Sequence, residues 1–178
     1  MMNKQKNHVQ RLILAAMFAA LCTVATMVIQ IPAPTGYVNL GDAVSLLAGL
    51  TLGPVYGFAA AGLGGAMADL LLGWGMYAPG TFLVKGTMAA VASLLFLMYD
   101  KKGCKPTVPR LLVCTVPAEV LMALGYFVYE SVILKYGVGA AASIPANLMQ
   151  GLVGTVAAVA LFRLLWQVPA LRKRFWKG

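Results

Sequence analysis

The sequence predicts an all-α membrane protein, formed as a single domain over residues 1–178 in which six transmembrane helices make a bundle. Three observations predict it. The chain is 61% hydrophobic and 11% charged, whereas soluble domains average about 25% charged residues. Twelve of its 14 lysines and arginines fall in three short clusters. Long apolar stretches separate these clusters, and about 20 apolar residues are enough to cross a bilayer.

The positions of the cations predict the topology. Cytoplasmic loops of membrane proteins hold an excess of lysine and arginine. If all three clusters are cytoplasmic, an even number of spans separates each from the next, and both termini are cytoplasmic. The other two cations, Lys85 and Lys135, then lie on or near the outer side. The clusters are Lys4, Lys6 and Arg11; Lys101, Lys102, Lys105 and Arg110; and Arg163, Arg172, Lys173, Arg174 and Lys177.

Six apolar segments satisfy this count. Prolines and glycines punctuate the first half of the chain, with Pro32-Ala33-Pro34 after the first segment, Gly53-Pro54 after the second and Gly73-Trp74-Gly75 after the third. The second segment is the shortest, and its residues cross about 30 Å of hydrocarbon only if the helix is tilted or shielded by protein. The predicted spans are about 9–31, 42–52, 55–72, 81–99, 109–134 and 145–167.

Several function classes are excluded. The only histidine, His8, lies in the polar N-terminal tail, so a histidine-ligated metal site is not expected, and neither is a cofactor. The three cysteines have no CxxC spacing. No G-x-x-x-x-G-K-[ST] motif is present to bind ATP. The excess of cations caps apolar spans, which favours anchoring to lipid headgroups over nucleic-acid binding.

The third segment carries a ladder of small residues, with Gly57, Ala61 and Gly65 followed by Asp69 at intervals of four. Small residues at this spacing let another helix pack closely. A carboxylate at membrane depth is costly and is normally paired or solvated in a cavity. We expect Lys85 to be its partner, either as a structural ion pair or as a pair that releases one member to a ligand.

The fifth segment places Glu119, Tyr126 and Glu130 on one helical face, since their spacings are seven and four residues. Glu130 and Tyr126 approach the outer end of the predicted span. Glu130 is a candidate ligand or gate residue. Glu119 lies deeper, and either a ligand role or an internal hydrogen bond explains it.

The outer loops offer further candidates. Tyr37, Asn39 and Asp42 precede the second segment, where Asn39 or Asp42 either caps the helix or belongs to a semi-rigid lid. Trp74 and Tyr77 follow the third segment as interfacial anchors or as a stacking wall.

The first and last segments complete the set. Asn147 and Gln150 share one face just inside the sixth segment and form either a polar clamp between helices or a recognition site for a polar heterocycle. Ala15, Ala16, Ala19 and Ala20 form a small-residue patch near the cytoplasmic end of the first segment. We interpret this patch as a docking face for a partner helix, with Ala15 and Ala19 as the contact residues.

Several motifs occur in an order that resembles a known family. The first span has A-x-x-x-A at Ala15 and Ala19. The further motifs are Tyr37-Val38-Asn39-Leu40-Gly41-Asp42-Ala43-Val44, Gly53-Pro54-Val55-Tyr56-Gly57, Ala68-Asp69-Leu70-Leu71-Leu72-Gly73, Tyr77-Ala78-Pro79-Gly80-Thr81 and Lys85-Gly86. With the six spans, they resemble the substrate-binding (S) components of energy-coupling factor (ECF) vitamin transporters, and within them the riboflavin and hydroxymethylpyrimidine subgroup.

The resemblance implies a multi-pass protein of the bacterial plasma membrane that captures a vitamin-like molecule in its outward half. It implies three partner chains, a transmembrane coupling subunit (EcfT-like) and two ATPases, so this chain itself is not an enzyme. Ala15 and Ala19 match the alanine motif that contacts the coupling subunit, and Asn147 matches a ligand-contacting residue. In the riboflavin binders that this chain resembles, the motif N-x-x-K-G stands where this chain has Asn147-Leu148-Met149-Gln150-Gly151. Glutamine in place of the lysine favours hydroxymethylpyrimidine or pyridoxine-like compounds over riboflavin.

A stand-alone proton-coupled carrier is the alternative, with Glu119 as the proton site. Carriers often show inverted repeats and broken helices at the midplane, and neither is evident in the sequence. The predicted substrate-binding residues are Tyr37, Asn39, Asp69, Trp74, Tyr77, Lys85, Tyr126, Glu130, Asn147 and Gln150.

Overall fold

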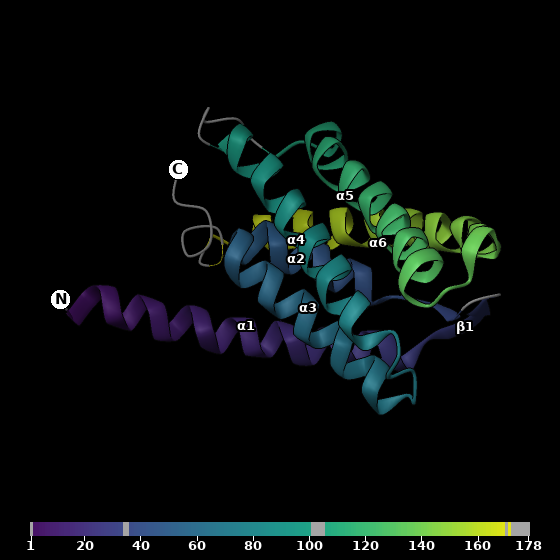
Figure 1. The fold of residues 1–178 in the computed structure, drawn as a ribbon. Helices are drawn as coiled ribbons and strands as arrows, with labels where there is room; N and C mark the ends of the chain where they lie inside the picture. Colours follow the sequence, from purple (N-terminus) through teal and green to yellow (C-terminus); the bar gives the residue numbers. More distant parts are fainter. Residues whose placement is uncertain (1, 34–35, 101–105, 170, 172–178) are drawn as a thin grey trace.

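The structure, a computed structural model, describes residues 2–33, 36–100, 106–169 and 171. In it, six α-helices run back and forth between two ends of a bundle (Figure 1). The start of α1 and the last turns of α6 lie at one end, here called the termini end. A small β-hairpin lies at the other, the hairpin end (Figure 1). Most of two predicted cationic clusters, 101–105 and 172–178, falls outside the described residues.

The hairpin corrects the all-α prediction. Helix α1 (Met2–Val28) ends before Ile31, and strands β1 (Gln30–Ala33) and β2 (Gly36–Asn39) pair antiparallel with Ile31 opposite Val38. The residue before a proline favours extended backbone. Prolines at 32 and 34 therefore hold both Ile31 and Ala33 extended, which ends the helix despite the continuing apolar run.

Helix α2 (Gly41–Leu52) is the centre of the bundle. It contacts α1, α3, α4 and α6, and 11 of its 12 residues are buried. A 12-residue helix is only about 18 Å long. The surrounding helices therefore shield it, as expected for the short second segment.

Helices α3 (Pro54–Leu71) and α4 (Ala78–Asp100) pack closely through small residues. Pro54 occupies the first turn of α3, where its missing N–H costs nothing. A Cβ added at Gly57 would lie 2.6 Å from the Cα of Gly49, and one at Gly65 would lie 2.7 Å from Cγ2 of Thr81. The glycine ladder thus sets the distance from α3 to α2 and α4.

The second half of the chain contains α5 (Val108–Val128), a π-helical turn (Tyr129–Ile133), a 3-10 helix (Gly137–Ser143) and α6 (Ile144–Gln167). The segment expected as a loop after residue 134 is thus mostly helical. In the described residues, four helical segments are long and apolar enough to cross a membrane. They are His8–Val28, Ala78–Tyr99, Val108–Ile133 and Gly137–Gln167. Six membrane crossings stay a prediction.

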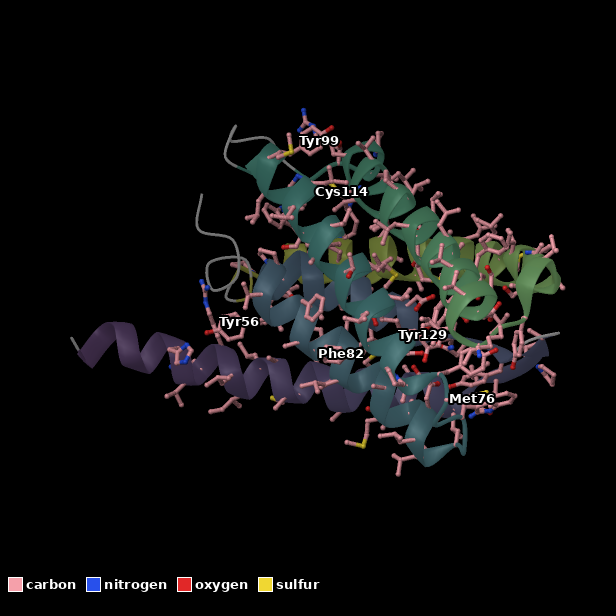
Figure 2. All side chains as sticks on the ribbon, in the orientation of Figure 1. Tyr56, Met76, Phe82, Tyr99, Cys114 and Tyr129 are labelled. Atoms are coloured by element: carbon pink, nitrogen blue, oxygen red, sulfur yellow. The ribbon has the colours of Figure 1, made fainter. Side chains whose placement is uncertain are left out.

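One of three buried apolar clusters lies at the termini end. Phe162 is fully buried, and its ring lies 5.3 Å from that of Phe96 and 6.0 Å from that of Trp166. Leu47, Leu50, Leu111, Cys114 and Val159 belong to the same buried cluster, and Tyr99 packs against it. Tyr99 and Cys114 lie on the side of the bundle away from Met76 and Tyr129, which are at the hairpin end (Figure 2).

Candidate functional site

A cavity of ≈ 50 Å³ lies at the hairpin end, which is enough for several water molecules. The hairpin, the helices α3 to α6 and the connecting segments contribute its walls. All ten residues predicted from the sequence to bind substrate line it, and so do four that were not predicted. The lining residues are Ala33, Tyr37, Asn39, Asp69, Trp74, Tyr77, Thr81, Lys85, Tyr126, Glu130, Ser143, Ala146, Asn147 and Gln150.

Lys85 forms its ion pair with Asp42, and the predicted pairing with Asp69 is wrong. The Lys85 Nζ lies 3.1 Å from Oδ1 of Asp42 and donates a hydrogen bond of 3.1 Å to Oδ1 of Asn39. Both charged side chains are at most 2% exposed. Asp42 and Asn39 were both candidates to cap α2, and the structure supports Asn39, whose Oδ1 accepts a hydrogen bond of 2.9 Å from the backbone N–H of Gly41, the first residue of the helix. Asp42 points into the bundle because it lies one residue into a helix that is buried all round.

Gln150 joins this pair to the hairpin. Its Oε1 accepts a hydrogen bond of 2.7 Å from the backbone N–H of Asn39, and its Nε2 donates to Oδ2 of Asp42. The buried amide therefore bridges β2 and α2 from α6, which agrees with the interpretation of Gln150 as a polar clamp. Asn147, one turn earlier, lines the cavity and makes no side-chain hydrogen bond to the described residues.

Asp69 is held by the hairpin. Its Oδ1 accepts a hydrogen bond of 2.7 Å from the hydroxyl of Tyr37. Burial and the neighbouring carboxylate raise the pKa of Tyr37, so the phenol stays a donor at neutral pH. The Asp69 carboxyl is 5% exposed, and its Oδ2 has no hydrogen-bond partner among the described residues.

Three aromatic rings form a corner of the cavity. The Trp74 ring lies 6.0 Å from that of Tyr37 and 5.9 Å from that of Tyr77, the latter edge to face. Trp74 comes from the turn after α3 and Tyr77 from the residue before α4, so this short connection supplies two of the three rings. Both residues line the cavity, as a stacking wall requires.

Sequence reasoning missed two hydroxyl groups. Thr81 accepts a hydrogen bond of 3.0 Å from the Tyr126 hydroxyl and lies near the Asp69 carboxyl. Ser143 donates one of 2.6 Å to Oε2 of Glu130. Thr81 lies one helical turn before Lys85, a spacing that could have revealed it. Ser143 depends on the 3-10 helix that folds back to Glu130, which no sequence pattern indicated.

Glu119 lies close to this network without lining the cavity. It is 5% exposed, and neither carboxyl oxygen has a hydrogen-bond partner among the described residues. The expected internal hydrogen bond is therefore absent from this part of the chain. A Cβ added at Gly151 would lie 2.9 Å from the Cβ of Glu119, and one at Gly154 would lie 3.0 Å from its Oε1. Two glycines of α6 thus leave room for the carboxyl group.

The alanine pair assigned to partner docking lies on a different face than expected. Ala15 is buried in a cluster with Ala48 and Ala60. The backbone of Ala19 lies against Gly64, where an added Cβ would be 2.6 Å from the Ala19 carbonyl oxygen. The exposed alanines of α1 are Ala16 and Ala20.

The arrangement suits binding. Among the described residues, no group of three or more His, Cys, Asp or Glu side chains is placed to hold a metal ion. The cavity instead brings together hydroxyl, amide and carboxylate groups beside aromatic rings, which is the chemistry that orients a small polar ligand.

Comparison with known proteins gives the family. Residues 6–167 match the family model described as ECF-type riboflavin transporter, S component. A protein of Pyrococcus woesei described as "Uncharacterized protein in gap 3'region" is 33% identical over 136 residues, or 75% of this chain and 86% of the relative. The fold is similar to that in "Structure and mechanism of the S component of a bacterial ECF transporter", with a TM-score of 0.70, 24% identity, and 90% and 97% of the two chains covered. This chain belongs to the ECF transporter S-component family, and is thus a membrane protein and a substrate-binding transporter subunit, not an enzyme.

Proposed function

We propose that this chain is the high-affinity subunit that binds a vitamin or vitamin precursor in the hairpin-end cavity of an ECF-type importer. The observation that carries the proposal is the cavity itself, where polar side chains and three aromatic rings converge at one end of the bundle. In this proposal all six helices cross a bacterial plasma membrane, both termini are cytoplasmic, and the cavity faces outward.

The contacts favour hydroxymethylpyrimidine or a pyridoxine-like compound as the substrate. The matching family model names riboflavin, which is the other candidate. Two features support a smaller heterocycle. The side chain of Gln150 forms hydrogen bonds with Asn39 and Asp42. Gln150 occupies the position of the lysine in the riboflavin-binder motif N-x-x-K-G. A single ring also requires less opening of a cavity of ≈ 50 Å³ than a three-ring ligand.

The partners follow from the family. A transmembrane coupling subunit and two ATPases supply the energy for uptake, and we propose that the coupling subunit docks on α1. Because Ala15 is buried and Ala19 is only partly exposed, the exposed alanines Ala16 and Ala20 are the accessible part of the small-residue patch. Small side chains permit a partner helix to approach closely.

A ligand screen tests the binding role. The purified chain in detergent is heated with each B vitamin and each vitamin precursor in turn, and hits are measured by calorimetry. We expect one class of compound to raise the melting temperature and to bind with a stoichiometry of one. A folded chain that binds none of them contradicts the proposal.

Co-purification with the coupling subunit tests the partner role, and an uptake assay tests the carrier alternative. Ala16→Trp and Ala20→Trp are expected to reduce co-purification with the coupling subunit while ligand binding stays unchanged. Ala160→Trp is the matched control, since Ala160 is an exposed alanine on α6. Equal loss in the control, or loss of ligand binding, contradicts the docking surface. Uptake by the chain alone in proteoliposomes, without ATPases, supports a proton-coupled carrier instead.

A further inference from the structure

Buried carboxyl groups outnumber buried cations among the residues whose burial is described. Four carboxyl groups are at least nine-tenths buried, whereas Lys85 is the only buried cation among the residues whose burial is described. The whole chain carries a formal charge of +9, so an acidic interior does not follow from composition. Uncompensated charges are costly in a bundle of low dielectric. The carboxyl groups are those of Asp42, Asp69, Glu119 and Glu130.

Lys85 forms its ion pair with Asp42. Its Nζ lies 3.1 Å from Asp42, and its further hydrogen bond goes to the neutral amide oxygen of Asn39. The coulombic energy of such a pair falls with distance, so the contact with Asp42 takes most of the lysine's compensating charge. Two of the three other carboxyl groups, those of Asp69 and Glu130, line the cavity.

One oxygen atom of the Asp69 carboxyl forms no hydrogen bond with the described residues, although the Thr81 hydroxyl lies near this carboxyl. The Tyr37 hydroxyl fixes Oδ1 of Asp69 at 2.7 Å, while Oδ2 has no hydrogen-bond partner among the described residues. Hydrogen bonds to an ionised carboxylate are roughly twice as strong as those between neutral groups. A ligand with a positively charged N–H group therefore supplies a hydrogen-bond donor to Oδ2. It also brings a positive charge next to the carboxyl group.

The aromatic corner favours the same kind of ligand. Trp74 has ring neighbours at 6.0 and 5.9 Å, from Tyr37 and Tyr77, and all three residues line the cavity together with Asp69. Aromatic faces attract cations, most strongly for tryptophan and in desolvated sites. Carboxylates beside such faces therefore select against anions and prefer a cation to a neutral compound of equal size.

We propose that the substrate of this chain is a small heterocycle with a net positive charge, bearing a protonated amine that donates to Oδ2 of Asp69. The inference rests on the proposed function, since it names the substrate class of the same cavity. The Glu130 carboxylate, whose Oε2 already accepts a hydrogen bond from Ser143, contributes to the compensation across the cavity. Asp69 then determines the preference for a positively charged ligand.

Two matched ligands test the charge directly. Pyridoxamine and pyridoxine differ by an aminomethyl group in place of a hydroxymethyl group, so their sizes are nearly equal and only the former carries an ammonium. Calorimetry at pH 7 on the full chain in detergent, with thiamine as a permanent cation and riboflavin as an uncharged ligand, gives the comparison. We expect the amine to bind at least about tenfold more tightly than the alcohol, as for one charge-assisted hydrogen bond.

Variants locate the effect. Asp69→Asn keeps the shape of the side chain and is expected to bring the ratio of the two affinities close to one. Glu119→Gln, which removes a buried carboxyl outside the cavity wall, is expected to leave the ratio unchanged. The wild-type comparison needs no variant, so it stands even if Asp69→Asn folds poorly.

The possible failures are distinguishable. Equal or tighter binding of pyridoxine or riboflavin overturns the cation class and leaves the proposed function intact. A ratio that Asp69→Asn does not change overturns the role of Asp69. If the folded chain binds none of the four compounds nor any other vitamin, the proposed function falls and this inference falls with it.

Discussion

The two ends of the bundle differ in how completely side chains fill the space between the helices. At the termini end, aromatic and aliphatic side chains such as Phe96, Phe162 and Leu111 fill the space between helices. At the hairpin end, a cavity interrupts the packing, and hydroxyl, amide and carboxyl groups line it. Close-packed interiors rarely contain such a cavity, and this is why we propose the hairpin end as the ligand site.

Two aspartates sharpen this comparison. Asp42 and Asp69 are both buried, but Asp42 has Lys85 and Gln150 as partners whereas one oxygen of Asp69 has none. The burial of a carboxylate therefore does not reveal its role. The ion pair with Lys85 ties Asp42 to α4, whereas Asp69 has no such pair among the described residues, and we therefore propose Asp69 as the residue that accepts a ligand.

The largest effect on stability is expected from Lys85→Met. It leaves Asp42 without a counter-ion in the centre of the bundle, and breaking a buried pair in this way costs about 3–5 kcal/mol. Thermal or denaturant unfolding in detergent measures it. The double variant Lys85→Met/Asp42→Asn removes both charges and is expected to recover at least half of the loss. A double variant as unstable as the single one shows that the ion pair is not the cause.

A similar loss, without any effect on the cavity, is expected from Phe162→Ala. The fully buried ring packs between Phe96 and Trp166, and removing such a ring costs about 3–5 kcal/mol. Unfolding and ligand affinity are measured on the same samples. Leu161→Ala, next along α6 and 41% exposed, is the control. If Phe162→Ala changes affinity in the folded protein, the two ends are not independent.

A smaller effect is expected where helices approach through glycine. A side chain at Gly49 would clash with the backbone of Ala89, so Gly49→Ala forces α2 and α4 apart. Overpacking of this kind costs about 1–3 kcal/mol. Gly139→Ala is the control, because nothing lies within 4 Å of the added Cβ. Equal stability of the two variants contradicts close packing at Gly49.

Much of this fold could be predicted from apolar segments and their breakers. Helices α2 to α6 begin and end within three residues of the predicted segments, apart from the π-helical turn that extends α5. The hairpin was missed because Ile31 continues an apolar run, and a strand of four residues carries too short a pattern to outweigh it. The 3-10 helix before α6 has no periodic signal either.

The residues that line the cavity were largely predictable, but their pairings were not. Rare polar residues in an apolar chain draw attention individually, so all ten substrate-binding candidates lie at the cavity. The choice of Asp42 over Asp69 as partner of Lys85 depends on how α2 sits among its neighbours. That is set by tertiary packing of the glycines, and helix periodicity contains no information on it. The face of Ala15 was misjudged for the same reason.

The smallest effect on stability is expected from Glu119→Gln. This variant tests whether a buried carboxyl group just outside the cavity wall takes part in ligand binding. The carboxyl has no hydrogen-bond partner among the described residues, so an amide of the same size breaks no hydrogen bond and cannot ionise in the buried interior. The free energy of unfolding at neutral pH is therefore expected to equal or exceed that of wild type, with ligand affinity unchanged. Marked destabilisation contradicts this view of Glu119. Loss of uptake with intact binding points instead to a proton site, because an amide cannot release a proton, and that result revives the carrier alternative.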